Sequence, residues 1–386
     1  MRVSTPCRTW SCRIKFTRGA NIHIVAEIWS TICSTVVPKL EECLDEPLSA
    51  KLKQLVGILE IVRIEETVPA APPNRRGRKR LDRRAIARAF VAKAVYDLPT
   101  TEQLIEMLRM QPSLRRICGF ARRTDIPSSA TFSRAFAAFA TLKLADTVHA
   151  TLVQTYVGQQ VVMHISRDAT EIVAREKPVK TQKPEPKPKK KRGRPKKGQP
   201  SPVPEPTRLE KQVGQTIEQA LADLPYVCNV GTKTDSKGHK HSWIGWKTHI
   251  DWADGAFPIT VVTTSASLHD SQVAVPMTKM TALRVTSLYD LMDSAYDAPA
   301  IRQTSQECGH RPLIDANKRR GDALPFDPAT AVRFRERTTA ERGNSRLKDS
   351  FGGRHLRVRG HAKAHLHVMF GIVALFADQW LKFVRN

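Results

Sequence analysis

The first half of the chain places apolar residues three and four positions apart, which is the spacing of an amphipathic helix. The stretch Ser49–Val62 shows this spacing, and Arg83–Leu98 shows it again and ends at Pro99. Shorter stretches of the same kind follow, separated by Thr, Pro and Gly. We therefore expect a helical domain over residues 76–158, after a poorly defined N-terminal segment over residues 1–75.

After Gly158 the apolar pattern changes to alternation, which is the period of a β-strand. Three strands come first, followed by a helix, a strand, a helix, a short strand and a final long helix. This is the order of a ribonuclease-H-like mixed sheet, in which the ends of the first and fourth strands lie side by side at the centre. The pattern thus predicts an α/β catalytic domain over residues 159–386, with strands at Val161–Asp168, His241–Trp252, Phe257–Thr264, Val285–Met292 and Leu313–Ile314, and helices at His269–Thr281, after Asp297 and from about Ala331.

A segment of different composition interrupts this domain. Residues 177–206 contain eleven Lys or Arg, two Glu and nine Pro. Because such a segment cannot bury a core, we expect a disordered basic insert rich in polyproline II.

The charge of the whole chain limits the class of partner. Its 386 residues include 63 Lys or Arg and 37 Asp or Glu, a net charge of +26, which predicts a polyanionic partner. The seven cysteines are never spaced as Cys-x-x-Cys and indicate reduced thiols. No secretion signal is present, and the longest apolar run, Val368–Ala377, is far shorter than the roughly 20 residues of a membrane helix. We expect a cytoplasmic protein that does not bind a membrane.

The helical domain contains a candidate DNA-reading helix. The sequence from Asp125 to Phe136 indicates a turn, an N-cap at Ser128 or Ser129, and a helix with exposed hydroxyls. Two helices, a turn and a capped helix are typical of a helix-turn-helix, whose last helix enters the major groove of DNA. The alternative is a plain helical scaffold. The candidate DNA contacts are Ser129, Thr131 and Arg134.

Two aspartates stand at the ends of the strands expected at the centre of the sheet. Asp168 ends the first strand and Asp293 ends the fourth, where carboxylates can hold Mg²⁺ or Mn²⁺. Asp290 and Asp297 compete with Asp293 for this position, and Asp270 is either structural or a supporting group. No cysteine lies at ligand spacing from a histidine, which disfavours a zinc site.

The final helix carries a group of chemically distinct residues on one face. If residues 334–348 form one helix, Phe334, Arg337, Glu341 and Lys348 lie within roughly 60° of one another. Glu341 could then bind metal while the two cations hold phosphates. Glu336 is its rival.

These four residues resemble the Tyr-(2)-Arg-(3)-Glu-(6)-Lys motif of the DDE transposases of bacterial insertion sequences, with Phe334 in place of Tyr. Stacking on a base or sugar survives this replacement. Other segments are similar to further parts of the family: Asp168-Ala169-Thr170 to the first aspartate block, Leu291–Asp297 to the second, Gly245–His249 and His269–Ser271 to the intervening strands, and Arg78–Phe139 to the preceding helical domain. The resemblance covers roughly residues 76–386 apart from the basic insert.

The resemblance implies an enzyme that excises and inserts a mobile element. Asp168, Asp293 and Glu341 would hold two Mg²⁺ (or Mn²⁺) ions about 3.5–4 Å apart for in-line displacement at phosphorus, by water for nicking and by a DNA 3′-OH for strand transfer. Its partners would be double-stranded element ends and target DNA, in an assembly of two or more protomers. Two alternatives are an inactive DNA-binding descendant of a transposase and a nuclease of the same fold.

The basic insert contains a second candidate DNA contact. Its sequence Lys191-Arg192-Gly193-Arg194-Pro195-Lys196-Lys197 resembles an AT-hook, in which Gly-Arg-Pro lies in a narrow minor groove. The alternative is a generic polycation that binds the DNA backbone. In either case Arg192, Arg194 and Lys196 would contact DNA.

Overall fold

The structure is a computed structural model that describes residues 22–44, 46–70, 82–158, 160–179, 205–234, 238–316 and 325–385. Nearly all of the predicted basic insert, including Arg192, Arg194 and Lys196, lies outside these ranges.

The described residues up to 158 form helices. They are α1 (Ile22–Thr31), the π-helix η1 (Ile32–Val36), α2 (Val37–Leu44), α3 (Ala50–Val62), α4 (Ile64–Thr67), α5 (Arg84–Val95), α6 (Thr101–Met110), α7 (Pro112–Ile117), the 3₁₀ turn η2 (Arg123–Asp125), α8 (Ser129–Thr141) and α9 (Leu144–Tyr156). The predicted helices at 49–62 and 83–98 are confirmed. Residues 22–67, where the sequence predicts only one helix, contain four α-helices.

Local capping explains where several of these helices begin. The Ser49 side chain accepts a hydrogen bond from the Leu52 N–H at the start of α3. Thr100 and Gln103 form a reciprocal capping box at the start of α6, which satisfies two backbone donors that the helix leaves free. Ser128 occupies the N-cap of α8, as predicted, although its hydroxyl contacts the Thr131 hydroxyl (3.2 Å) rather than the helix backbone.

The second half of the chain contains a six-stranded mixed sheet. Its strands are β1 (Val161–Val173), β2 (Asn229–Thr234), β3 (Lys240–Ala253), β4 (Phe257–Ser265), β5 (Thr286–Met292) and β6 (Arg311–Ile314). The path through the sheet is β2-β3-β1-β5-β6, with β4 also paired to β3. Strand β1 is antiparallel to β3 and parallel to β5, which is parallel to β6. All five predicted strands are present, but the prediction that Asp168 ends the first strand is wrong, because β1 continues to Val173 through its pairing with β3.

Strand β2 is the addition that the sequence pattern does not predict. It pairs antiparallel with the first part of β3, opposite residues 240–245. Its sequence, Asn-Val-Gly-Thr-Lys-Thr, has one large apolar residue and is mostly exposed, so it carries no apolar alternation. Backbone pairing with β3, rather than burial of a face, therefore defines this strand.

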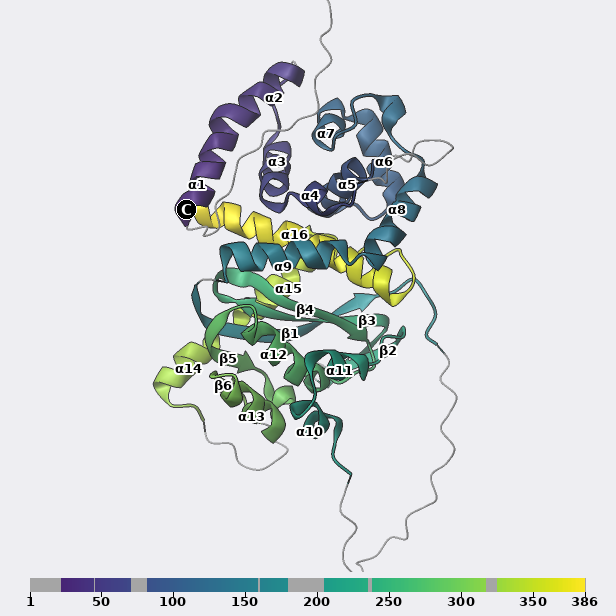
Figure 1. Cartoon of the computed structure of the whole chain (residues 1–386). Coiled ribbons are helices and arrows are strands. Elements are labelled where there is room, and N and C mark those ends of the chain that lie inside the picture. Colours follow the sequence, from purple (N-terminus) through teal and green to yellow (C-terminus); the bar gives the residue numbers. More distant parts are fainter. Residues whose placement is uncertain are drawn as a thin grey trace, which may run out of the picture.

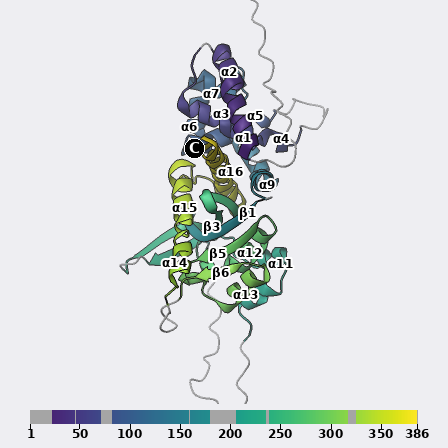
Figure 2. The same ribbon diagram turned by 90° about the vertical axis from the view of Figure 1, so that its left-hand side faces the viewer.

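Helices cover both faces of the sheet. Figure 2 shows α14 (Pro328–Arg335) and α15 (Thr338–Ser350) on one side and α11 (Ile217–Ala222), α12 (Ala274–Ala282) and α13 (Pro299–Glu307) on the other. The short helix α10 (Arg208–Val213) packs against α12 and α13. The sequence predicts one long helix from about Ala331. The structure has two helices instead, α14 and α15, with a break at Glu336 and Arg337.

The last helix, α16 (His361–Arg385), is the centre of the molecule. It packs against α1, α3, α5, α8 and α9 on one side and against β4 on the other, and Figure 1 shows it running with α9 between the helical region and the sheet. One contiguous cluster of buried apolar residues extends from Ile28 to Leu381 and includes Ile165 and Trp252 of the sheet. By length and composition α16 could span a membrane, but 72% of its apolar window is buried in the protein. The helical region and one face of the sheet thus share a core, and two smaller apolar clusters lie between the sheet and α11–α13.

Candidate active site

Asp168 and Asp293 lie level with each other on neighbouring strands. In the parallel pairing of β1 with β5, Ser166 is opposite Leu291. Asp168 and Asp293 each follow two residues later, so both reach the same edge of the β1–β5 pair. Asp293 also caps the 3₁₀ turn η5 (Ser294–Tyr296), where its Oδ1 accepts a hydrogen bond from the Ala295 N–H (2.9 Å).

Both carboxyl groups hold their protons more tightly than exposed aspartates do. Burial raises the pKa of Asp168 to about 6, and the charges of Asp293 and Asp270 add to this effect. Burial also raises the pKa of Asp293, although the Ala295 N–H and Arg337 partly oppose the rise. Because a buried carboxylate is costly without a compensating charge, these two groups favour a cation beside them.

Asp270 is a third carboxylate of this region. The Lys247 ammonium donates to its Oδ1 at 2.9 Å, and the charges of His249 and Lys247 lower its pKa despite its burial. Tyr296 lies among the three aspartates, whose charges join burial in raising the pKa of its phenol well above the ordinary value. The buried Tyr296 hydroxyl has no hydrogen-bond partner among the residues that the structure describes. The sequence left Asp270 open between a structural and a supporting role, and the structure ties it to Lys247.

The predicted motif on the final helix is divided between two helices. Phe334 belongs to α14, Arg337 is the N-cap of α15, and Glu341 and Lys348 lie within α15. The expectation of one uninterrupted helical face is therefore wrong at Glu336–Arg337. The contacts along the motif remain: the Arg337 guanidinium lies 6.0 Å from the centre of the Phe334 ring and donates to Glu341 Oε1 at 2.9 Å.

Glu341 is paired with Arg337 and does not join the two aspartates in this structure. Its side chain is 56% exposed. Over the described ranges, no group of three or more His, Cys, Asp or Glu side chains is arranged closely enough to hold a metal ion. Arg337 also lowers the pKa of Asp293 through its charge. One cation thus interacts with two of the three predicted ligands.

Helix α15 is nevertheless fixed against β1 on both sides of Glu341. The Ser166 hydroxyl donates to the Glu336 carbonyl oxygen at 3.2 Å, before α15 begins. Farther along, the Asn344 amide donates to Asp168 Oδ2 at 2.9 Å. Glu341 lies three residues before Asn344, which is about 4.5 Å along a helix axis. The stretch of α15 that carries Glu341 therefore crosses the sheet at the level of Asp168.

Two sequence comparisons extend this picture. The sequence model of the family described as "Transposase DDE domain" matches residues 164–377, which is more than half of the chain and contains Asp168, Asp293 and Glu341. The chain belongs to the DDE transposase family. The model described as "Transposase domain (DUF772)" matches residues 40–138. This match begins before residue 76, where the resemblance was expected to begin.

No curated protein and no solved structure matches this transposase. The family assignment therefore depends on the two family models.

Asn344 is a site residue of the transposase that sequence reasoning missed. Besides donating to Asp168, it accepts a hydrogen bond from the Trp252 indole N–H of β3 (3.3 Å). The neighbouring Gly343 lies directly on that indole, because a Cβ there would be 2.7 Å from three ring atoms. The absence of a side chain at Gly343 lets α15 approach the sheet closely enough for Asn344 to reach Asp168. The signal in the sequence is the Gly-Asn pair one turn after Glu341.

Replacing Asn344 by Ala should slow DNA cleavage by the transposase about 10- to 100-fold, since a hydrogen bond to a charged group contributes roughly 1.5–3 kcal/mol. Without the amide, Asp168 loses a donor that fixes its carboxylate. Single-turnover cleavage of a labelled DNA end measures the effect. Ser345→Ala, at the next and exposed position of α15, is the matched control and should cleave like the wild type. Unchanged cleavage by Asn344→Ala would contradict this role.

The opposite face of β1 carries a buried ion pair that supports the site. Arg167 points away from α15, and its Nε and Nη2 donate to Asp251 Oδ1 and Oδ2 of β3 at 2.7 and 2.8 Å. Its Nη1 donates to the Ala274 carbonyl (3.1 Å) and the Thr278 hydroxyl (2.9 Å) of α12. The exposed fractions of the Arg167 and Asp251 side chains are 1% and 0%. Arg167 therefore joins β1, β3 and α12 directly behind Asp168.

The two aspartates that compete with Asp293 have other partners. Asp290 is buried on β5, where its Oδ2 contacts His310 Nδ1 (3.2 Å). Asp297 accepts hydrogen bonds from the Arg302 guanidinium (2.9 and 3.2 Å). Both arrangements favour structural roles for these residues.

The predicted DNA contacts of the transposase fall in different places. Lys348 is half-buried on α15. Ser129, Thr131 and Arg134 lie at the start of α8, where the Arg134 guanidinium donates to the Thr131 hydroxyl (3.2 Å) and the Ser129 hydroxyl donates to Glu102 (3.0 Å). Helix α8 packs against α6 and α9. Arg192, Arg194 and Lys196 belong to the part of the chain that the structure does not describe.

Proposed function

We propose that this transposase binds the terminal inverted repeats of an insertion sequence and catalyses metal-dependent DNA cleavage and strand transfer in the cytoplasm. The observation that carries the proposal is the level placement of Asp168 and Asp293 on β1 and β5, with the motif-bearing helix α15 held to Asp168 by Asn344. Membership of the family establishes that the chain is a transposase. Binding and catalysis at the element ends are the additional claims of this proposal.

A ribonuclease-H-like fold is part of this proposal. The strand pairing supports it. β3 pairs antiparallel with both β1 and β4, and β5 pairs parallel with both β1 and β6. β1 thus lies between β3 and β5, and the predicted metal ligands of β1 and β5 meet at the middle of the sheet. Strand β2 is an addition to this arrangement.

The residues present fit a hard divalent cation such as Mg²⁺ or Mn²⁺. Asp168 and Asp293 offer carboxylate oxygens, and both have raised pKa values that a neighbouring cation would lower. We infer that Glu341 is the third ligand and that it exchanges Arg337 for the metal site when DNA binds. When bound, the metal would activate the attacking oxygen and stabilise the leaving 3′ oxygen at phosphorus.

The side chains around the acidic residues would hold the DNA. Arg337, released from Glu341, is placed to contact a phosphate beside Asp293, and Phe334 offers a ring to a base or sugar. Lys348 would contact a phosphate two turns farther along α15. The Lys247 ammonium donates to Asp270 at 2.9 Å and so neutralises its negative charge. Asp270 would therefore not be a metal ligand in this proposal.

The helical region over residues 76–158 is proposed to bind the element ends. Ser129, Thr131 and Arg134 supply donors on one end of α8, as a helix that enters a major groove requires. Residues 177–206 would add backbone or minor-groove contacts through Arg192, Arg194 and Lys196. A dimer or larger assembly on DNA would bring two ends together for strand transfer.

Incubating the protein with its cognate element end and Mg²⁺ should produce cleavage that EDTA abolishes. Adding a supercoiled target plasmid should then yield joined products, because the freed 3′-OH attacks the target phosphodiester. Cleavage without joining would indicate a nuclease of the same fold. Binding without cleavage would indicate an inactive descendant, and a lack of both would contradict the proposal.

A further inference from the structure

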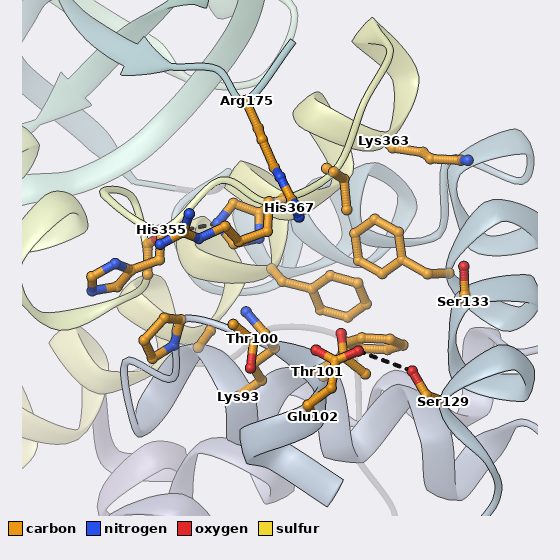
Figure 3. A pocket seen from close by; sticks show the side chains of 18 of the residues that line it. Lys93, Thr100, Thr101, Glu102, Ser129, Ser133, Arg175, His355, Lys363 and His367 are labelled. Atoms are coloured by element: carbon orange, nitrogen blue, oxygen red, sulfur yellow. Dashed lines mark hydrogen bonds between the residues drawn. The ribbon is translucent and has the colours of Figure 1, made fainter.

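A cavity of about 620 Å³ lies away from the acidic residues, where the helical region meets the sheet. It is formed by α5, the start of α6, the start of α8, the chain after β1, the loop before α16 and the first turns of α16. Figure 3 shows Lys93 and Glu102 on the side of α5 and α6, and Arg175 reaching in from the side of the sheet. The cavity thus joins the two halves of the chain.

The lining of this cavity is strongly basic. Its cationic residues come from four separate segments: Lys93, Arg175, Arg357, Arg359 and Lys363. In the described ranges none of these five forms an ion pair. Glu102 is the one carboxylate in the lining. Convergence of uncompensated cations from distant segments creates a positive potential that attracts an anion.

Lys93 is the residue that distinguishes this cavity from an ordinary basic surface. The residue is 9% exposed, so most of its side chain is buried, but its ammonium is not fully enclosed and faces the cavity. The ammonium makes no hydrogen bond or ion pair to any described residue. Burial lowers the pKa of Lys93 to about 8. A lysine with a buried stem and an ammonium that faces a cavity presents its charge to whatever occupies that cavity. Together with the other cations of the lining, Lys93 therefore favours an anion there.

The two carboxylates whose charges act on Lys93 are already engaged. Asp97 Oδ1 accepts a hydrogen bond from the Gly352 N–H (2.9 Å), and Asp97 Oδ2 lies 3.6 Å from His355. Glu102 Oε1 accepts from the Ser129 hydroxyl (3.0 Å). Both groups are thus held by other partners, and neither neutralises the ammonium by contact.

The remaining walls favour an organic anion over a bare ion. Phe136 and Phe370 line the cavity and stack with ring centroids 6.0 Å apart. The Phe90 ring centroid lies 4.9 Å from that of Phe136 and 5.5 Å from that of Phe370. Thr100 and Ser133 add hydroxyl groups. An apolar wall with hydroxyls and a cation suits a sugar–phosphate unit, whose deoxyribose is apolar on one side.

The cavity and the acidic residues are connected by a single strand. From Asp168 the chain continues along β1 to Val173, and Arg175 lies two residues farther on. This distance is roughly 20 Å for seven extended residues, which corresponds to about six nucleotides along one strand of duplex DNA. One DNA molecule can therefore reach both places.

We propose that this cavity binds a backbone phosphate of DNA, with Lys93 as its buried counter-charge, and so anchors the substrate several nucleotides from the reacting phosphate. The inference depends on the proposed function only in that DNA is the partner. The Arg and Lys residues at the cavity opening direct the strand inward, and Lys93 fixes its position.

The variant Lys93→Met tests this site. It should weaken binding of a fluorescein-labelled DNA duplex of unrelated sequence about tenfold at low salt and reduce the slope of log affinity against log salt by about 0.9, because one phosphate contact is lost. Measured in EDTA by anisotropy, the result does not depend on whether the protein cleaves DNA. Without DNA the variant should have an unchanged or higher Tm, because a costly buried charge is removed.

Lys39→Met, on the exposed side of α2, is the matched control and should change the slope less. Arg357→Gln at the cavity opening provides a second variant, with a smaller loss of affinity expected. An unchanged slope and affinity for Lys93→Met would overturn the proposal, as would a lower Tm with unchanged binding. Raising inorganic phosphate at constant ionic strength distinguishes the source of the anion: if phosphate raises the Tm of wild type but not of Lys93→Met, while DNA binding is equal in both, the site binds a small anion and not DNA.

Discussion

Replacing Asp293 by Asn should reduce metal-dependent DNA cleavage by roughly three orders of magnitude, because losing one carboxylate removes several kcal/mol of charge stabilisation and each 1.4 kcal/mol corresponds to a tenfold change in rate. The change is nearly isosteric, and the Asn amide oxygen can still accept the hydrogen bond that Asp293 receives from the Ala295 N–H. DNA binding should therefore stay within about twofold of wild type. Cleavage of a labelled element end in Mg²⁺ and anisotropy in EDTA measure the two quantities separately.

Asp297→Asn is the matched control for this prediction. Asp297 lies four residues later, is also an aspartate of the second block, and accepts hydrogen bonds from Arg302. Its replacement should leave the cleavage rate close to that of wild type. Equal cleavage by Asp293→Asn and wild type would falsify the metal-ligand assignment, and a loss confined to Asp297→Asn would transfer it to that residue.

Replacing Arg167 by Met should destabilise the protein by about 3–5 kcal/mol, which is the usual cost of leaving one partner of a buried ion pair without the other. Asp251 would then be an uncompensated carboxylate with 0% exposure, and from the described residues it would keep the hydrogen bond from the Thr281 hydroxyl (2.6 Å). Urea unfolding followed by tryptophan fluorescence measures the loss of stability. The chain has six tryptophans, and one of them, Trp252, follows Asp251 on β3.

The control for Arg167 is an exposed arginine–aspartate pair with a single contact of the same Nε–Oδ length. Arg208 Nε lies 2.7 Å from Asp223 Oδ2, the same distance as between Arg167 Nε and Asp251 Oδ1, but the side chains are 35% and 51% exposed. Arg208→Met should therefore change the unfolding free energy by less than about 1 kcal/mol. Similar losses for the two variants would show that burial does not govern the Arg167–Asp251 interaction.

The sequence predicts five of the six described strands and the two aspartates on β1 and after β5 because both depend on local signals. Alternating apolar residues define β1 and β5, and the carboxylate directly after β5 is visible without knowledge of the fold, whereas Asp168 lies inside β1 because pairing with β3 extends that strand to Val173. The parallel register, with Ser166 opposite Leu291, then places Asp168 beside Asp293. The helices at 49–62 and 83–98 follow from the same kind of local pattern.

What the sequence does not predict depends on contacts between distant segments. Asn344 reaches Asp168 across 176 positions of the chain, and no periodicity within α15 indicates this contact. The interruption at Glu336–Arg337 has no Gly or Pro to mark it, and the Glu336 carbonyl oxygen instead accepts a hydrogen bond from Ser166 of β1. Lys93, whose ammonium has no ion-pair partner among the described residues, lies in a regular helical pattern that gives no sign of the cavity it lines.

The position of α16 has a consequence for how the protein is made. Every element that packs on this helix, from α1 to β4, leaves the ribosome earlier than α16 does. Until residues 361–385 emerge, neither the helical region nor the sheet has the apolar surface that joins them. A nascent chain thus cannot combine its proposed DNA-binding and catalytic parts into one unit, and a stop codon ahead of α16 would disable both parts at once.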